Sequence, residues 1–198
     1  MKYNELNLGQ IEALVNKLGG MEGVQRFLSG ELIVSAAAQV WKTWCKIKLG
    51  TGLKDVDDFR KTLKKADCNI GDWGNDILGK PAFTVSSEET EVELVNVSVA
   101  ELGFKAGATR ADIYKRANEL GLDLCPNEVG PQLRLQYKDQ SKGEWLLIAM
   151  EPIAGSDGGL SVFRVERRGG GGQWLGGVDG RPVSFWGADD RWVFLRRK

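Results

Sequence analysis

The chain has 198 residues, and its 27 lysines and arginines balance its 27 aspartates and glutamates, so the formal net charge is zero. This balance provides no global field that would attract a nucleic acid or an acidic partner, and the length is that of one large or two small domains. Histidine is absent, which excludes Ser-His-Asp and Cys-His nucleophile systems within this chain.

Two short amphipathic segments open the chain. Residues 7–18 and 21–28 carry apolar side chains at helical spacing, and a pair of glycines separates them. This pattern predicts a helical hairpin. The pattern is also similar to a helix-turn-helix, in which Gln25 and Arg26 would read DNA bases, although the turn lacks the small polar residue of that motif.

Strict alternation of side chains over residues 40–49 predicts a strand. The face that would point away from the core carries three lysines and one tryptophan: Lys42, Trp44, Lys46 and Lys48. A basic face with an aromatic side chain suits stacking and phosphate contact on single-stranded nucleic acid, so these four are the candidate contact residues. The alternative is an ordinary solvated face, on which lysines protect an edge strand.

Two further helices are expected before residue 80. The first begins at Asp55, and the second covers residues 70–78 with Ile70, Trp73 and Ile77 on its apolar face. The Gly-Thr-Gly sequence at residues 50–52 lacks the other residues of a dinucleotide-binding or Walker phosphate loop. We therefore interpret it as a tight turn.

The most sharply specified helix follows Thr109. Thr109 is a good N-cap, Asp112 favours the positive helix start, and Gly121 can adopt the positive φ that ends a helix. The side chains between these ends that share one apolar face are Ile113, Tyr114, Ala117 and Leu120. This pattern predicts a helix that packs against the core.

The rest of the chain is rich in candidate strands. Residues 133–137 alternate like a half-buried strand, and residues 144–153 are apolar enough to form the central strand of a sheet. Residues 160–168 and 173–178 flank a glycine run and should pair as a hairpin, and residues 191–195 form a last strand. Because a parallel crossover needs a dozen or more residues, the short Gly-rich turns predict antiparallel pairing.

The expected fold is therefore α+β. An N-terminal helical hairpin and short helices accompany a mainly antiparallel C-terminal sheet, a meander, which packs on one central helix. We expect two domains, with the hairpin in residues 1–34 and the α+β domain in residues 35–198. The acidic, polar residues 84–90 mark a candidate sub-boundary.

The sequence predicts no catalytic constellation, no metal site and no cofactor. Its cysteines are odd in number, far apart and without a C-x-x-C motif: Cys45, Cys68 and Cys125. This usage indicates free thiols in a reducing compartment, with Cys125 as a buried structural thiol. We recognise neither a membrane span nor a signal peptide, so we expect a cytoplasmic protein with no membrane partner. Trp186, near Arg181 and Arg191, is a candidate for lining a surface groove.

Several stretches in combination carry a family resemblance. They are NLGQIEALVNKLGG near the start, LGLDLCPNEVGP in the centre and EWLLIAMEPI before a Trp-rich end. Over nearly its full length the chain resembles a family of small proteins encoded in genomes of uncultivated bacteria and in metagenomic assemblies. No activity, ligand or active site is known for that family. The resemblance implies a free-standing bacterial protein and assigns no functional residue.

Three classes of function are compatible with these observations. The first is a binding or interaction module with a protein or nucleic-acid partner, and we favour it because a catalytic constellation is missing. The second is a helix-turn-helix-like DNA-binding regulator. The third is an enzyme that depends on carboxylates near strand ends or turns, of which the candidates are Asp139, Glu144, Glu151 and Asp157. The oligomeric state does not follow from the sequence.

Overall fold

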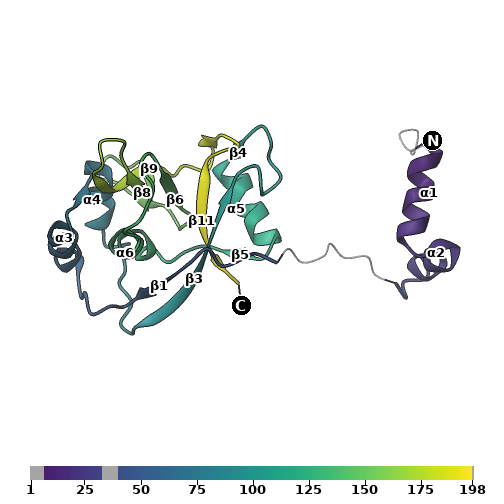
Figure 1. Cartoon of the computed structure of the whole chain (residues 1–198), viewed down its shortest axis with the longest axis horizontal. Helices are drawn as coiled ribbons and strands as arrows, with labels where there is room; N and C mark the ends of the chain where they lie inside the picture. The colour runs from purple at the N-terminus through teal and green to yellow at the C-terminus, as the bar shows by residue number, and fades with distance from the viewer. Residues whose placement is uncertain (1–6, 33–39, 198) are drawn as a thin grey trace. The chain divides into compact units, whose positions relative to one another are not determined.

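The computed structural model describes residues 7–32 and 40–197 (Figure 1). The chain divides into two compact units, Met1–Ala38 and Gln39–Lys198. The expected boundary between residues 34 and 35 lies outside the described residues, and the candidate sub-boundary at residues 84–90 lies inside the second unit. None of the described helices combines the length and the apolar composition of a membrane span.

The first unit contains the two expected helices, α1 (Leu8–Lys17) and α2 (Gly20–Leu28). Asn7 caps α1 reciprocally: its side chain accepts the backbone N–H of Gln10, and the Gln10 side chain accepts the backbone N–H of Asn7. Gly19 has a φ of 90°, which lets the chain turn tightly between the helices. The predicted helical hairpin is confirmed.

The described residues of the second unit include one nine-stranded sheet, and seven of its strands form a continuous path. From edge to edge the path is β1 (Cys45–Leu49), β3 (Thr90–Ser98), β11 (Arg191–Arg196), β6 (Trp145–Ile148), β8 (Leu160–Arg167), β9 (Gln173–Asp179) and β2 (Cys68–Ile70). The two remaining strands pair off this path, β5 (Leu122–Asp123) with β11 and β7 (Ile153–Ala154) with β8. A separate two-stranded sheet consists of β4 (Ala108–Thr109) and β10 (Phe185–Trp186).

The predicted antiparallel meander is wrong, although the α+β class is confirmed. The sheet is mixed, because β11 pairs parallel to β6 and β2 pairs parallel to β9. The hairpin of β8 and β9 is antiparallel as expected, and β6 lies at the centre of the path. Short turns fix only the pairing of sequence neighbours. The strands β2 and β11 reach their parallel partners from distant parts of the chain, and local patterns carry no information on such pairing.

Helix α6 (Val129–Gln136) stands where the sequence predicted a strand over residues 133–137. Its buried side chains include Val129, Leu133 and Arg134, which recur at helical spacing; the alternation after residue 132 arises because Leu135 is also half-buried. The helix contacts β1, β8 and β9, which come from opposite ends of the strand path. The sheet therefore curls around α6, which lies between β1 and β8 in Figure 1.

Helix α5 (Arg110–Glu119) follows the prediction closely. The Thr109 hydroxyl accepts the backbone N–H of Asp112 at 3.2 Å, and Gly121 has a φ of 82°. Tyr114 packs edge-on against Trp192 and is also edge-on to a second aromatic ring of β11. Helices α3 (Val56–Lys65), α4 (Asp72–Leu78) and α6 also contact strands of the sheet, so the core does not rest on one helix.

The edge strand β1 is held on its open side by Gln136, the last residue of α6. The Gln136 side chain accepts the backbone N–H of Lys48 at 2.9 Å and donates to the carbonyl of Lys48 at 2.8 Å. A single side chain thus satisfies both backbone polar groups of one edge residue. On the same strand Ile47 and Leu49 are buried, whereas Lys46 and Lys48 are exposed.

Candidate functional site

An open cavity of about 470 Å³ lies in the second unit, where α4 (Asp72–Leu78) meets residues 155–161 and the end of β9. Glycine backbone forms part of its lining, and the side chains that give it chemical character are Asp72, Trp73, Asp76, Asp157, Asp179 and Arg181. The cavity thus combines one large aromatic side chain with four carboxylates and a single guanidinium. Binding sites in proteins have this general form: a concave surface with an apolar wall and a few polar groups.

Glycines seat α4 close to the sheet. A Cβ atom on Gly74 would lie 2.8 Å from the carbonyl oxygen of Leu175, and one on Gly177 would lie 2.9 Å from Trp73 atoms. Ile77 and Leu78 are buried beneath the helix. Because Gly74 and Ile77 define the inner face, Trp73 points outward and is 57% exposed.

The predicted apolar face of this segment is therefore wrong in two respects. Ile70 belongs to strand β2, and the helix begins only at Asp72. Trp73 was expected to face the core but instead lines the cavity. The close approach of Gly74 to β9 is a tertiary contact that rotates the buried face away from Trp73.

Asp76 joins α4 to the loop after β7. Its carboxylate accepts the Ser156 hydroxyl at 2.6 Å and the Ser156 backbone N–H at 2.7 Å, and it forms an ion pair with Lys80 at 3.1 Å. These donors, first the Ser156 hydroxyl, lower the pKa of Asp76 to about 2. The Lys80 ammonium also donates to the Ser156 hydroxyl at 2.6 Å, so each of the side chains of Asp76, Lys80 and Ser156 contacts the other two.

Asp179 and Arg181, which also line the cavity, form an ion pair with each other. The Arg181 guanidinium donates to Oδ2 of Asp179 at 2.6 Å and to Oδ1 at 3.0 Å, and the Arg181 backbone N–H donates to Oδ1 at 3.0 Å. These contacts hold the pKa of Asp179 well below its ordinary value. Arg181 is thereby neutralised by its own neighbour.

The cavity carries an excess of negative charge. Asp76 and Asp179 each have a basic partner. In the described part of the chain, Asp72 and Asp157 form no ion pair, although one Asp157 oxygen accepts the backbone N–H of Gly159. Two uncompensated carboxylates beside an exposed indole give this surface an affinity for cations.

No family model, no curated protein and no solved structure matches this chain. The family resemblance drawn from the sequence stays a prediction.

The predicted contact face on β1 is broken up by carboxylates. Lys46 pairs with Glu91 at 3.1 Å and with Glu93 at 3.2 Å, and Lys48 pairs with Glu89 at 2.8 Å. These acids belong to β3 or to the segment just before it, next to β1. Phosphate would have to displace an existing partner from each of these two lysines.

The other two residues of that face precede the strand, which begins at Cys45. Lys42 is exposed, whereas Trp44 is half-buried and meets Tyr137 edge-on, with ring centroids 5.1 Å apart. The structure therefore does not bring the four residues together as one basic surface. Binding of a nucleic acid there stays a prediction.

The hairpin residues proposed to read DNA are exposed, but Arg26 forms an ion pair with Glu31 at 3.1 Å. The described hairpin residues include three glutamates against one lysine and one arginine. In its described residues the hairpin thus carries more acidic than basic side chains, whereas DNA-binding surfaces are typically basic, and binding of DNA there stays a prediction.

The remaining candidates lie elsewhere. Of the four carboxylates considered for catalysis, Asp157 lines the cavity, whereas Glu144 accepts the Tyr137 hydroxyl at 3.0 Å. Cys125 is buried, which raises the pKa of its thiol. Trp186 is half-buried and meets Trp192 edge-on at 5.4 Å. Within the described residues, no group of three or more Cys, Asp or Glu side chains could hold a metal ion.

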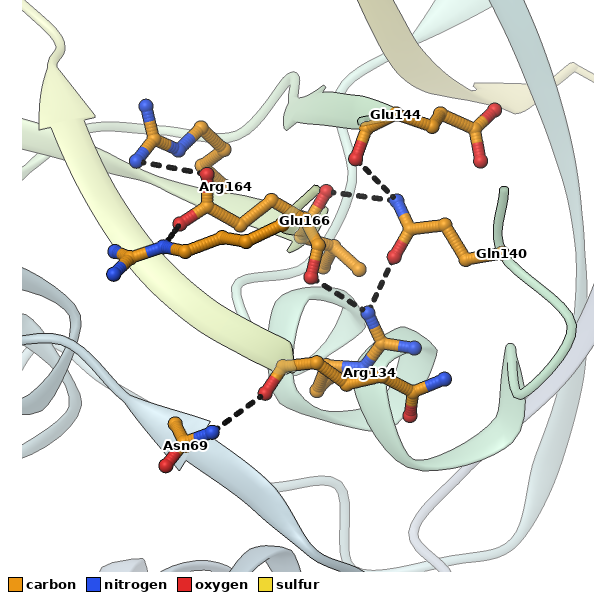
Figure 2. A network of polar contacts seen from close by, with 9 residues as sticks. Asn69, Arg134, Gln140, Glu144, Arg164 and Glu166 are labelled. Carbon is orange, nitrogen blue, oxygen red and sulfur yellow. Dashed lines mark hydrogen bonds and ion pairs between the residues drawn. The ribbon is translucent and has the colours of Figure 1, made fainter. Parts of the chain in front are cut away.

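A second polar cluster lies in the core around Arg134, which is fully buried (Figure 2). Its guanidinium donates to the Gln140 side chain and to the carbonyls of Tyr137 and Glu166. Gln140 in turn donates to the carbonyl of Val165 at 3.1 Å. Burial lowers the pKa of Arg134. These contacts tie the loop after α6 to β8, and the Arg134 Nε is buried without a hydrogen-bond partner.

Proposed function

We propose that the chain is a binding protein whose second unit takes a small organic cation in the α4 cavity. The observation that carries this proposal is the exposed Trp73 indole beside the uncompensated carboxylates of Asp72 and Asp157. An aromatic face attracts an ammonium or guanidinium group through its quadrupole, and neighbouring carboxylates add charge attraction. The ligand class is therefore an amine, a quaternary ammonium ion or a guanidinium compound.

The electrostatics support binding over acid–base catalysis. Paired-carboxyl catalysis requires one carboxyl group that keeps its proton near neutral pH. Asp76 and Asp179 both have lowered pKa values and are therefore ionised at neutral pH. They contribute negative charge to the cavity and hold no proton to donate.

The contact between Ser156 and Lys80 does not support nucleophilic catalysis either. A serine–lysine pair requires a neutral lysine that accepts the hydroxyl proton. The Lys80 ammonium forms an ion pair with Asp76 and donates to the Ser156 hydroxyl, and that hydroxyl donates its own proton to Asp76 and not to Lys80. This set stabilises the wall of the cavity.

Isothermal titration calorimetry tests the proposal with choline, spermidine and arginine as probes and with acetate and glucose as comparison compounds. We expect at least one cation to bind at millimolar concentration or below, and neither comparison compound to do so. Trp73→Ala should weaken binding about 5- to 30-fold, the equivalent of about 1–2 kcal/mol. Asp72→Asn with Asp157→Asn should weaken it further and reduce its sensitivity to salt.

The matched control is Trp145→Ala, because Trp145 is also exposed but lies outside the cavity lining. This variant should bind the same cation with unchanged affinity. The proposal fails if no cation binds, or if Trp73→Ala and Trp145→Ala bind it equally well.

A further inference from the structure

The helical hairpin of the first unit leaves most of its large apolar side chains in solvent. The exposed ones are Leu8, Ile11, Leu14, Met21, Phe27 and Leu28. Leu8 is 86% exposed and Leu28 is 77% exposed, although both lie in regular helices. Within the described residues of this unit, the only buried residue is Gly23.

These side chains follow helical spacing. Leu8, Ile11 and Leu14 are three residues apart along α1, and Met21 and Leu28 are seven apart along α2. Such spacing places them on continuous stripes, as in helices that pack against other helices. The exposed apolar side chains therefore form stripes and are not scattered.

Beyond its capping box and one ion pair, the hairpin has few means of stabilisation within itself. Helices shorter than about 12–15 residues are marginal in water, and units below about 40 residues usually need a disulfide, a metal or oligomerisation. Each of the two helices has 10 residues or fewer. The first unit contains neither cysteine nor histidine, so it has no disulfide and lacks the ligands most often used for structural zinc. Burial of the apolar stripes against another surface is therefore the remaining way to stabilise the two helices.

We propose that two copies of the hairpin associate through these stripes into a four-helix bundle, which makes the protein a dimer. The described hairpin residues carry three negative and two positive side chains, so two copies meet without strong repulsion. A standard interface buries about 800 Å² on each partner, of which about 60% is apolar. Six large apolar side chains at these exposures supply on the order of 400 Å², most of that apolar share.

Sedimentation equilibrium of the full chain over a micromolar range tests this. The wild-type protein should sediment at twice the monomer mass of 21.8 kDa. A Leu14→Glu, Leu28→Glu variant places charges on both stripes and should weaken dimerisation at least 30-fold. The matched control is Val183→Glu, Phe185→Glu, which makes the same change at exposed apolar residues of the second unit and should remain dimeric.

A monomeric wild-type protein overturns the proposal, and so does a dimer that survives in the Leu14→Glu, Leu28→Glu variant, because its interface would then lie elsewhere. Loss of the dimer in both variants also overturns it. A second measurement leaves the stripes unchanged, so it does not depend on whether the glutamate variant still forms its helices. The protein carries Cys45→Ser, and a spin label is attached at Asn16→Cys. Pulsed electron paramagnetic resonance should report a distance between the two labels, and its absence in concentrated protein contradicts the bundle.

Discussion

Glu93 connects three segments of the second unit. Its carboxylate accepts the Thr43 hydroxyl at 2.7 Å and pairs with Lys46 and with Arg196. These donors, first the Thr43 hydroxyl, lower the pKa of Glu93 to about 2 from an ordinary 4.5. Because the charged form is favoured in the folded state, its contribution to stability is complete above pH 4.5 and is lost as the pH falls through about 2.

Replacement of Glu93 by Gln should therefore destabilise the protein at pH 7, and the difference from wild type should shrink as the pH falls from 4.5 towards 2. Urea unfolding at a series of pH values measures this difference. Glu88→Gln is the control, since Glu88 is exposed and forms no ion pair in the described part of the chain. Equal pH profiles for the two variants would contradict the assigned role of Glu93.

Arg134 contributes through hydrogen bonds in the core and has no acidic partner there. Arg134→Met keeps most of the side-chain volume but leaves the buried Gln140 side chain and two partly buried carbonyls without this donor. We expect a loss of about 2–4 kcal/mol in the free energy of unfolding. Arg116→Met, at a half-exposed guanidinium, should cost less than about 1 kcal/mol in the same urea titration. A cost for Arg134→Met as small as the control would show that the network adds little.

At the scale of elements, the sequence was most informative where both ends of a helix were specified. Helix α5 has its N-cap at Thr109 and a positive φ at Gly121, and the apolar face between them is the buried one. The antiparallel pairing of β8 with β9 also follows from adjacent strands and a glycine turn. Residues close together in the sequence determine these elements, so sequence patterns could predict them.

The sequence was misleading where tertiary contacts decided the outcome. Residues 133–137 alternate in polarity, yet they belong to or follow α6, because a curled sheet surrounds that helix on several sides. Trp73 has the spacing of a core residue, but contact of Gly74 with β9 turns it outward. One usable signal for the site was present, since Asp72 and Asp76 are four residues apart and share a helix face.

The close packing of α4 against β9 can be tested with Gly74→Ala. Alanine favours a helix by about 1 kcal/mol over glycine, but the added Cβ would lie 2.8 Å from the Leu175 carbonyl. We expect a net destabilisation of about 1–3 kcal/mol and weaker cation binding, because the helix that carries Trp73 must shift. Gly170→Ala has open space around its Cβ and should change neither property. Thermal unfolding and calorimetry measure both, and a more stable Gly74→Ala variant would contradict this packing.

At the scale of the whole molecule, strand order and the cavity lay beyond prediction. The cavity combines α4, residues 155–161 and the end of β9, which are far apart in the sequence. Only the folded sheet brings them together, since the pairing of β2 with β9 carries α4 to its position. Of the four carboxylates that line the cavity, sequence patterns singled out only Asp157 as a candidate; Asp72, Asp76 and Asp179 were not among the candidates.

The Gln136 contact with β1 bears on how the protein behaves when concentrated. An open edge strand offers unpaired N–H and C=O groups as a template for a strand from another molecule. Here the Gln136 amide occupies both groups of Lys48, charged side chains flank them, and the strand at the other end of the path, β2, has only three residues. The sheet thus resists growth by strand addition, which leaves contacts between molecules to helical surfaces and protects the chain against fibril formation.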